Sequence, residues 1–220
     1  MPVSKIHVYF MPGLAASSRI FEFIELPGQA FEMHYLEWFV PDRGMSFEAY
    51  ARKMSTFIRH KQVVLVGVSF GGMLVQEMAK HISVNKVIII SSIKQKSEMP
   101  KRLLFAKYTK AHRLLPTGLV NNVELLAKYA FGETVTKRLS LYEQYLSLRD
   151  KYYLDWSIDQ IVHWDQTSYR SGLVHIHGDR DAVFPVAPIK DYIPVTGGTH
   201  TMILHRFKWF NERLPTIILE

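Results

Sequence analysis

Cysteine is missing from this sequence, and its absence excludes a thiol nucleophile, a disulfide framework and any cysteine-ligated metal. The sequence also lacks an uninterrupted apolar run of about 18 residues, so no membrane span is predicted. Residues 1–10 lead into a predicted strand and lack the basic and apolar segments of a signal peptide. We therefore expect a cytoplasmic protein, and no feature of the sequence indicates its oligomeric state.

No internal repeat or low-complexity tract divides the 220 residues, and a chain of this length can bury a substantial core as one unit. Strand-like and helix-like segments alternate along it, which is typical of a parallel sheet covered on both faces. The expected strands are 6–10, 31–40, 63–68, 86–92, 173–178 and 192–195, and the expected helices are 46–60, 71–81 and 200–213. We predict a single α/β domain over residues 1–220, with a mostly parallel central sheet and helices on both faces.

The most informative motif is Gly-Val-Ser-Phe-Gly at 67–71, which follows an apolar run and precedes a helix-like segment. A serine on such a tight strand-to-helix turn is pushed out of the backbone. Glycines flank it because a Cβ there would collide with the strand or the helix. Ser69 is therefore the candidate nucleophile, and the amino end of the following helix would stabilise negative charge beside it.

A serine hydroxyl needs a base to take its proton and a third group to orient that base. An apolar strand runs into a turn that carries Asp179 and Asp181, and this strand end faces the same edge of the sheet as Ser69. Further along, a glycine pair at 197–198 lets the chain turn and delivers His200. The chain order nucleophile, acid, histidine is the order expected on a sheet of this kind.

With these motifs the chain resembles the α/β-hydrolase family over nearly its whole length. The resemblance is carried by the elbow at 67–71, Gly178-x-x-Asp181 with Pro185, Gly197-Gly198-x-His200, and the turn at 11–14. It implies a triad of Ser69, Asp181 and His200, and an oxyanion hole formed by the backbone N–H groups of Leu14 and Phe70. The chain departs from the family pattern in two ways. Pro12 stands where a histidine often precedes the glycine of that turn. No room is left before Lys5 for the two N-terminal strands of many relatives, which implies a trimmed sheet.

Two of these assignments have competitors. The family spacing favours Asp181 as the acid, whereas Asp179 could instead accept hydrogen bonds from amides of the turn. His205 competes with His200, but the glycine loop places His200 at the strand end, and we expect His205 to pack or to face solvent.

A second pair of histidines, His175 and His177, lies on one side of a predicted strand. The two could share a metal, yet two ligands without a third partner make a poor site. We expect them to be buried structural histidines, and the sequence implies no cofactor and no metal.

Between about 94 and 165 the alternation breaks and the pattern becomes mostly helical, at the position where the family inserts a lid. We expect a helical cap over Ser69 there. Side chains on this segment that could line a pocket are Phe105, Tyr108, Leu126, Tyr129, Phe131, Tyr145 and Trp156. Residues of these types more often hold a cap onto its sheet, and a lined pocket needs several of them.

The net charge of +7 is unevenly spread, because residues 94–113 carry seven basic residues and one acid, Glu98. Two interpretations of this segment stand. It attracts an anionic ligand, such as an acyl thioester of a phosphorylated carrier, or it is a solvated helix face, which is the commoner role of charge runs. No recognition motif accompanies the charge, so no nucleic-acid partner is predicted.

We therefore predict a serine hydrolase that cleaves a small-molecule carboxylic ester through an acyl-enzyme. A thioesterase or a carbon–carbon bond hydrolase would use the same triad, since the triad sets the chemistry and the cap sets the substrate. The alternative of another class is a ligand-binding or receptor-like protein with little turnover.

Overall fold

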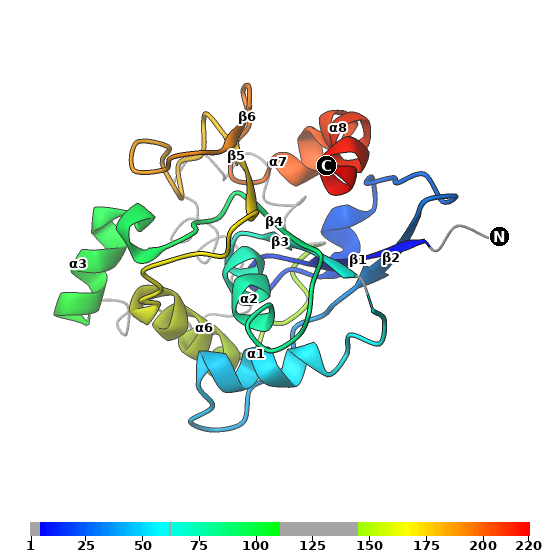
Figure 1. Ribbon diagram of the computed structural model, residues 1–220. Coiled ribbons are helices and arrows are strands. Elements are labelled where there is room, and N and C mark those ends of the chain that lie inside the picture. The colour runs from blue at the N-terminus through cyan, green and yellow to red at the C-terminus, as the bar shows by residue number, and fades with distance from the viewer. Residues whose placement is uncertain (1–4, 62, 111–144) are drawn as a thin grey trace.

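The computed structural model describes residues 5–61, 63–110 and 145–220 and is built around one sheet. Within these residues the strand order is β2-β1-β3-β4-β5-β6, and every neighbouring pair is parallel (Figure 1). The strands are β1 (Ile6–Met11), β2 (Phe31–Tyr35), β3 (Val63–Val68), β4 (Lys86–Ile90), β5 (Val174–Gly178) and β6 (Ile193–Val195). The predicted α/β class with a parallel central sheet is confirmed.

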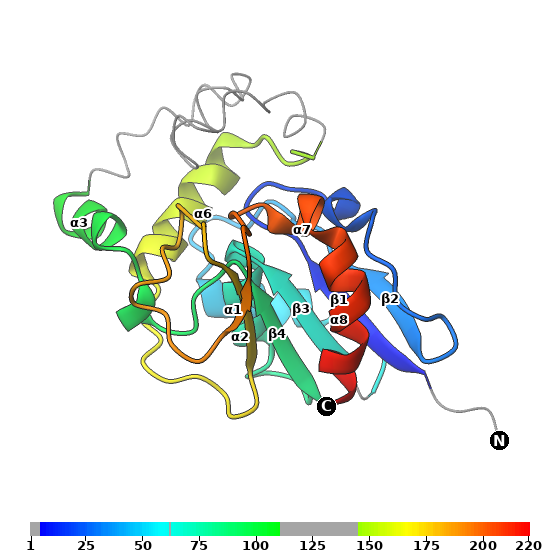
Figure 2. The same ribbon diagram turned by 90° about the horizontal axis from the view of Figure 1, so that it is seen from above.

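Helices cover both faces of the sheet, as Figure 2 shows from above. The described helices are η1 (Ser18–Phe21), α1 (Phe47–Ser55), α2 (Phe70–Met78), η2 (Lys96–Glu98), α3 (Lys101–Thr109), α6 (Lys151–His163), α7 (Met202–His205) and α8 (Phe207–Leu219). Buried side chains of α1, α2 and α6 share one core cluster, and those of η1, α7 and α8 share the other. Among the described residues, no helix has the length and apolar character needed to cross a membrane.

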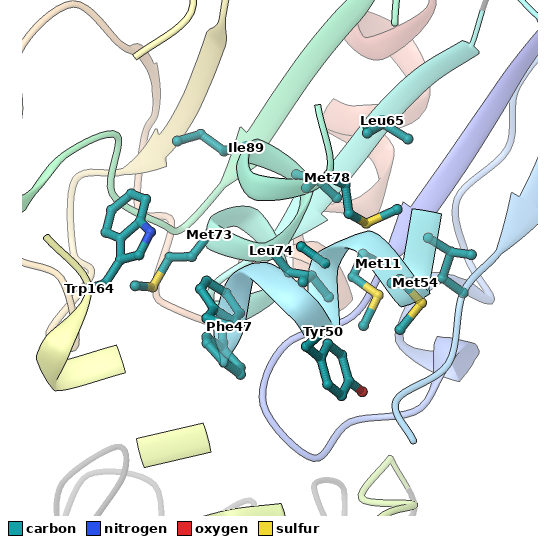
Figure 3. Packing of buried hydrophobic residues seen from close by; sticks show 14 of the residues in the cluster. Met11, Phe47, Tyr50, Met54, Leu65, Met73, Leu74, Met78, Ile89 and Trp164 are labelled. Carbon is teal, nitrogen blue, oxygen red and sulfur yellow. The ribbon is translucent and has the colours of Figure 1, made fainter. Parts of the chain in front are cut away.

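The central strand β3 explains how two cores form on one sheet. All its residues are buried, as expected for a parallel strand with both faces covered. Because successive side chains point to opposite faces, Leu65 packs in the α1 and α2 core with Met54 and Met73 (Figure 3). Its neighbour Val64 packs in the α8 core instead.

The largest differences from the predicted element boundaries concern three elements. The strand predicted to reach residue 40 ends at Tyr35, and beyond it Trp38 is buried with its Nε1 donating to the Gly13 carbonyl. Helix α1 starts after its N-cap Ser46, as predicted, but ends at Ser55 instead of residue 60. The predicted helix over 200–213 is split into α7 and α8 at Arg206, and α8 continues to Leu219 because its last turns bury apolar side chains against the sheet.

The expected cap over 94–165 is described only in part. Helices α3 and α6 belong to this segment and contact one another, while residues 111–144 lie outside the described residues. The extent of the cap stays a prediction.

Candidate active site

Ser69 lies at the sharp turn between β3 and α2. Its φ of 53° and ψ of −120° place a non-glycine residue in a strained conformation. The Ser69 N–H donates to the carbonyl of Ile90 (2.9 Å), and the Ser92 hydroxyl donates to the Ser69 carbonyl (2.7 Å). These contacts with β4 and the loop after it hold the turn and place Ser69 at the carboxyl edge of the sheet.

Glycines around the turn allow backbone segments to approach closely. A Cβ on Gly67 would lie 2.3 Å from the Gly71 carbonyl oxygen, and a Cβ on Gly71 would lie 2.3 Å from the Pro12 carbonyl oxygen. A Cβ on Gly178 would similarly lie 2.2 Å from the Gly198 carbonyl oxygen. No side-chain rotation relieves a clash with backbone, so these positions require glycine.

Ser69, His200 and Asp181 form a continuous hydrogen-bonded chain. The Nε2 atom of His200 lies 2.9 Å from Ser69 Oγ, and its Nδ1 atom lies 2.9 and 3.1 Å from the two oxygens of Asp181. The Asp181 carboxylate is fully buried, and the His200 side chain is 9% exposed. A carboxylate on Nδ1 favours the tautomer that leaves Nε2 free to accept a proton from the serine. The three predicted residues are thus brought together, and their catalytic roles stay a prediction.

The environment of Asp181 favours its ionised form. Burial alone would raise the pKa of Asp181, but the charge and hydrogen bond of His200 and a backbone amide outweigh it and hold the pKa below its usual value. The amides of Val183 and Phe184 donate to Oδ1 over 2.8 and 2.9 Å. The carboxylate is therefore charged at neutral pH and fixed in orientation.

The two competing residues have other partners. Asp179 is exposed, and its carboxylate accepts a hydrogen bond from the Gly197 amide over 2.7 Å. Its contact ties the turn to the glycine loop, where Gly197 has a φ of +66°. His205 lies in α7 with its Nε2 3.5 Å from Thr199 Oγ1.

His175 and His177 of β5 are buried and lead toward the acid. The Nε2 of His177 donates to the Phe184 carbonyl (2.8 Å), and its Nδ1 lies 3.0 Å from His175 Nε2. Burial, together with the charges of His177 and Lys94, lowers the pKa of His175 to about 2, and burial also lowers the pKa of His177. The neutral pair thus supports the loop after Asp181, a contact that the sequence did not indicate.

The predicted oxyanion-hole residues flank Ser69. Phe70 follows it as the first residue of α2. Leu14 follows Gly13, at which an added Cβ would lie 3.4 Å from Ser69 Cβ. Both backbone segments therefore lie beside the serine, and their use as oxyanion donors stays a prediction.

Two aromatic residues that the sequence analysis did not single out hold the turn at 11–14. The indole N–H of Trp38 donates to the Gly13 carbonyl (2.7 Å), and the buried Tyr153 hydroxyl accepts from the Ala15 amide (3.2 Å). Trp38 comes from a segment predicted as strand and Tyr153 from the predicted cap. No local pattern marks either residue, because their contacts depend on the tertiary fold.

The predicted pocket residues lie in different surroundings. Phe105 and Tyr108 on α3 are 66% and 81% exposed. Tyr145 and Trp156 are buried in the core, where each donates a hydrogen bond, to a carboxylate and to a backbone carbonyl respectively. The remaining three, Leu126, Tyr129 and Phe131, lie outside the described residues. The role of all seven residues as pocket lining stays a prediction.

Two basic residues of the segment 94–113 form contacts within the protein. Lys94 is buried with its Nζ 3.6 Å from the Glu98 carboxylate, and it donates to the Lys190 carbonyl. Arg102 donates to the carbonyls of Ala182 (3.0 Å) and Val183 (2.7 Å), which belong to the loop after Asp181. These two cations are engaged within the chain, and binding of an anion by the segment stays a prediction.

Neither a protein-family model nor a curated protein matches the sequence. Solved structures match it over nearly its whole length. An esterase from Thermogutta terrifontis with malate bound has a TM-score of 0.71 and 12% identity, over 97% of this chain and 91% of that chain. An N-acyl homoserine lactone degrading enzyme has a TM-score of 0.64 and 18% identity, over 97% and 93%. An α/β-hydrolase enzyme from a Medee basin deep-sea metagenome library has a TM-score of 0.71 and 9% identity, over 100% and 91%. At these identities the likeness establishes the fold.

Proposed function

We propose that this chain, which has the α/β-hydrolase fold, is a serine hydrolase that cleaves carboxylic esters of small molecules. The observation that carries the proposal is the 2.9 Å separation between His200 Nε2 and Ser69 Oγ, with Asp181 2.9 Å from the other ring nitrogen. A base within hydrogen-bond reach of the nucleophile, oriented by a buried carboxylate, is the arrangement that activates a serine hydroxyl. The esterase among the structural neighbours favours an ester substrate.

In the first half of the reaction, Ser69 Oγ attacks the ester carbonyl carbon while its proton passes to His200 Nε2. Asp181 stays ionised and stabilises the imidazolium. The tetrahedral oxyanion accepts hydrogen bonds from the N–H groups of Leu14 and Phe70, each worth about 3–4 kcal/mol. The amino end of α2, a helix of nine residues, also favours negative charge at this point.

The intermediate then collapses to an acyl-enzyme. His200 gives its proton to the leaving oxygen, the alcohol departs, and the acyl group remains on Ser69. Water next loses a proton to His200 and attacks the acyl carbon. The acid is released as the bond to Ser69 Oγ breaks, and His200 returns its proton to that oxygen. A cap over residues 94–165 would select the acyl group, and the same steps would cleave a thioester.

Covalent labelling with a fluorophosphonate, read by mass spectrometry of the intact protein and its peptides, tests the proposal. We expect one adduct per chain on Ser69, none in Ser69→Ala, and full labelling of Ser46→Ala, whose hydroxyl accepts a hydrogen bond at the start of α1. Nitrophenyl esters and acyl thioesters of matched chain lengths then give kcat/KM for each class. Labelling without turnover would indicate the receptor-like alternative, and a folded protein that takes no label would refute the proposal.

A further inference from the structure

A second group of histidines lies on the α1 side of the sheet, outside the candidate active site. His7 comes from β1, His34 and Glu32 from the neighbouring β2, and His60 from the loop after α1. In the register of these strands His7 pairs with Glu32, so their side chains point to the same face. We call His7, Glu32, His34 and His60 the β1–β2 cluster.

This cluster and Ser69 lie at opposite ends of the parallel strands. His7 pairs with Val63 at the start of β3, and Ser69 follows the end of that strand. Six residues at 3.3 Å each separate the two levels by about 20 Å. The β1–β2 cluster therefore has no contact with the reacting atoms of the proposed hydrolase.

The distances within the cluster match those of a metal coordination shell. One ligand atom from each residue can be chosen so that all four lie within 4.8 Å of one another. His7 Nδ1 lies 3.0 Å from His34 Nε2, and the Glu32 carboxylate lies 3.7 and 3.6 Å from these two nitrogens. A tetrahedral zinc ion with ligands at about 2.0–2.1 Å sets its ligand atoms about 3.3 Å apart. Side-chain rotations that bring the ligand atoms from at most 4.8 Å to about 3.3 Å apart would complete the shell.

The rings are suited to bind a cation. The ring centroid of His7 lies 5.2 Å from that of His34 and 3.7 Å from that of His60. Neutral imidazole offers the lone pair that a metal needs. The rings of His7 and His60 are stacked, with centroids 3.7 Å apart and planes 9° apart, so one of the two rings must rotate before both direct a nitrogen at the same ion.

A buried tyrosine orients the third ring. The Tyr9 hydroxyl lies 2.6 Å from His60 Nδ1 and accepts a hydrogen bond from the Arg59 amide over 3.3 Å. A ligating histidine commonly uses its second nitrogen for such a partner, which fixes the ring orientation. In the tautomer in which His60 Nδ1–H donates to the Tyr9 hydroxyl, the Nε2 lone pair of His60 is available as a ligand.

From this geometry we propose that His7, Glu32, His34 and His60 form a structural Zn²⁺ site that ties the loop after α1 to strands β1 and β2. Three imidazoles and one carboxylate form a ligand set that zinc accepts in four-coordinate sites. Nitrogen-rich ligands disfavour Mg²⁺ and Ca²⁺, which prefer oxygen. A complete set of four protein ligands is typical of a structural site, and the proposal does not depend on the hydrolase activity.

The test uses the full chain, dialysed against a chelator and then titrated with ZnCl₂ in a calorimeter. We expect one zinc per chain, and a Tm that rises by about 5–10 °C when free zinc reaches about 100 times Kd. MgCl₂ and CaCl₂ should produce neither effect. A wild-type chain that binds no zinc at micromolar concentration would overturn the proposal.

Variants separate this site from adventitious binding. Glu32→Gln changes a half-exposed side chain, so it should fold normally and weaken zinc binding by at least about tenfold. His34→Gln should abolish one-to-one binding. The matched control is His163→Gln, which alters an exposed histidine that lies 3.4 Å from the Asp159 carboxylate on α6 and should bind zinc like the wild type. Unchanged affinity in Glu32→Gln and His34→Gln would refute the site.

Discussion

Histidines at the two ends of the sheet differ in what surrounds them. At the carboxyl end, His200 has a hydroxyl on one nitrogen and a buried carboxylate on the other. At the amino end, the rings of His7, His34 and His60 crowd against one another, and the nearby carboxylate of Glu32 is half exposed. A histidine with a hydroxyl on one ring nitrogen and a carboxylate on the other is suited to proton transfer. Several histidines with nitrogens close to one another are suited to bind one cation.

This difference shows that the chemistry of a histidine depends on its partners more than on its burial. The side chains of His200, His7 and His34 are all partly or largely shielded, at 9%, 19% and 21% exposed. Among these three histidines, only His200 faces the candidate nucleophile Ser69. Substitutions that affect one end of the sheet and spare the other test this difference.

The largest expected effect, on ester turnover and on zinc binding, comes from substituting one histidine at each end of the sheet. His200→Gln should lower ester turnover by at least about 10⁴-fold, because no base remains to take the Ser69 proton, and it should keep zinc binding. His60→Gln should lose zinc and keep turnover. Steady-state kinetics and calorimetry on both variants measure this double dissociation. Loss of both properties in either variant would show that the two ends are coupled.

The next effect concerns the acid of the triad. Asp181→Asn should lower turnover by up to about 10⁴-fold, since the amide no longer holds the tautomer that leaves Nε2 free. Asp179→Asn is the matched control two residues away, and its carboxylate bonds only the Gly197 amide among the contacts described above. We expect kcat of this control within about tenfold of the wild type. A larger loss from Asp179→Asn than from Asp181→Asn would reverse the assignment.

A smaller effect should follow from loosening the turn beside Ser69. Trp38→Phe keeps an aromatic ring, smaller than the indole, but removes the N–H that donates to the Gly13 carbonyl. We expect kcat to fall by about tenfold, because misplaced oxyanion donors lose part of their contribution. Trp164→Phe removes a similar buried hydrogen bond, 2.8 Å from the indole N–H to Glu77. It should lower the free energy of unfolding by about 1–2 kcal/mol, as the loss of one buried hydrogen bond does, without lowering kcat. Equal kinetics in the two variants would contradict a positioning role for Trp38.

Much of the carboxyl end could be predicted from the sequence because its signals are local. The continuous apolar run of β3 and the glycines of the elbow at 67–71 each reflect a constraint within a few residues, namely burial on both faces and backbone approach. The glycine pair at 197–198 likewise marked the loop that delivers His200. Local signals of this kind can be recognised in the sequence without knowledge of the tertiary fold.

The β1–β2 cluster was missed because nothing local marks it. His7, His34 and His60 are separated by 27 and 26 residues, and they meet only through the register of β1 with β2 and the path of the chain after α1. The histidine pair that stands out in the sequence is His175 and His177, which are close along the chain. These two turned out to be hydrogen-bonded to each other and to a backbone carbonyl. Both are buried, as predicted, whereas the β1–β2 cluster becomes visible only through strand pairing.

The smallest predicted effect concerns the pH dependence of stability and comes from the buried pair His175 and His177. The pKa of His175 is about 2 in the folded protein and 6.5 in its ordinary state. Between these values the unfolded chain binds one more proton, so stability is present above pH 6.5 and is lost as pH falls below it. The slope is up to about 1.4 kcal/mol per pH unit for one group. The lowered pKa of His177 acts in the same direction.

Urea unfolding between about pH 7 and 5 measures this slope. His175→Gln can still donate to His177, and it should reduce the slope by up to about 1.4 kcal/mol per pH unit, whereas His163→Gln should leave it unchanged. Asp181 does not interfere, because its lowered pKa gives a stability that is lost only below its ordinary value of 3.8. Equal slopes in the wild type and His175→Gln would mean that His175 is protonated in the fold. The pair would then carry a positive charge beside Asp181, and its neutral support of the acid loop would have to be abandoned.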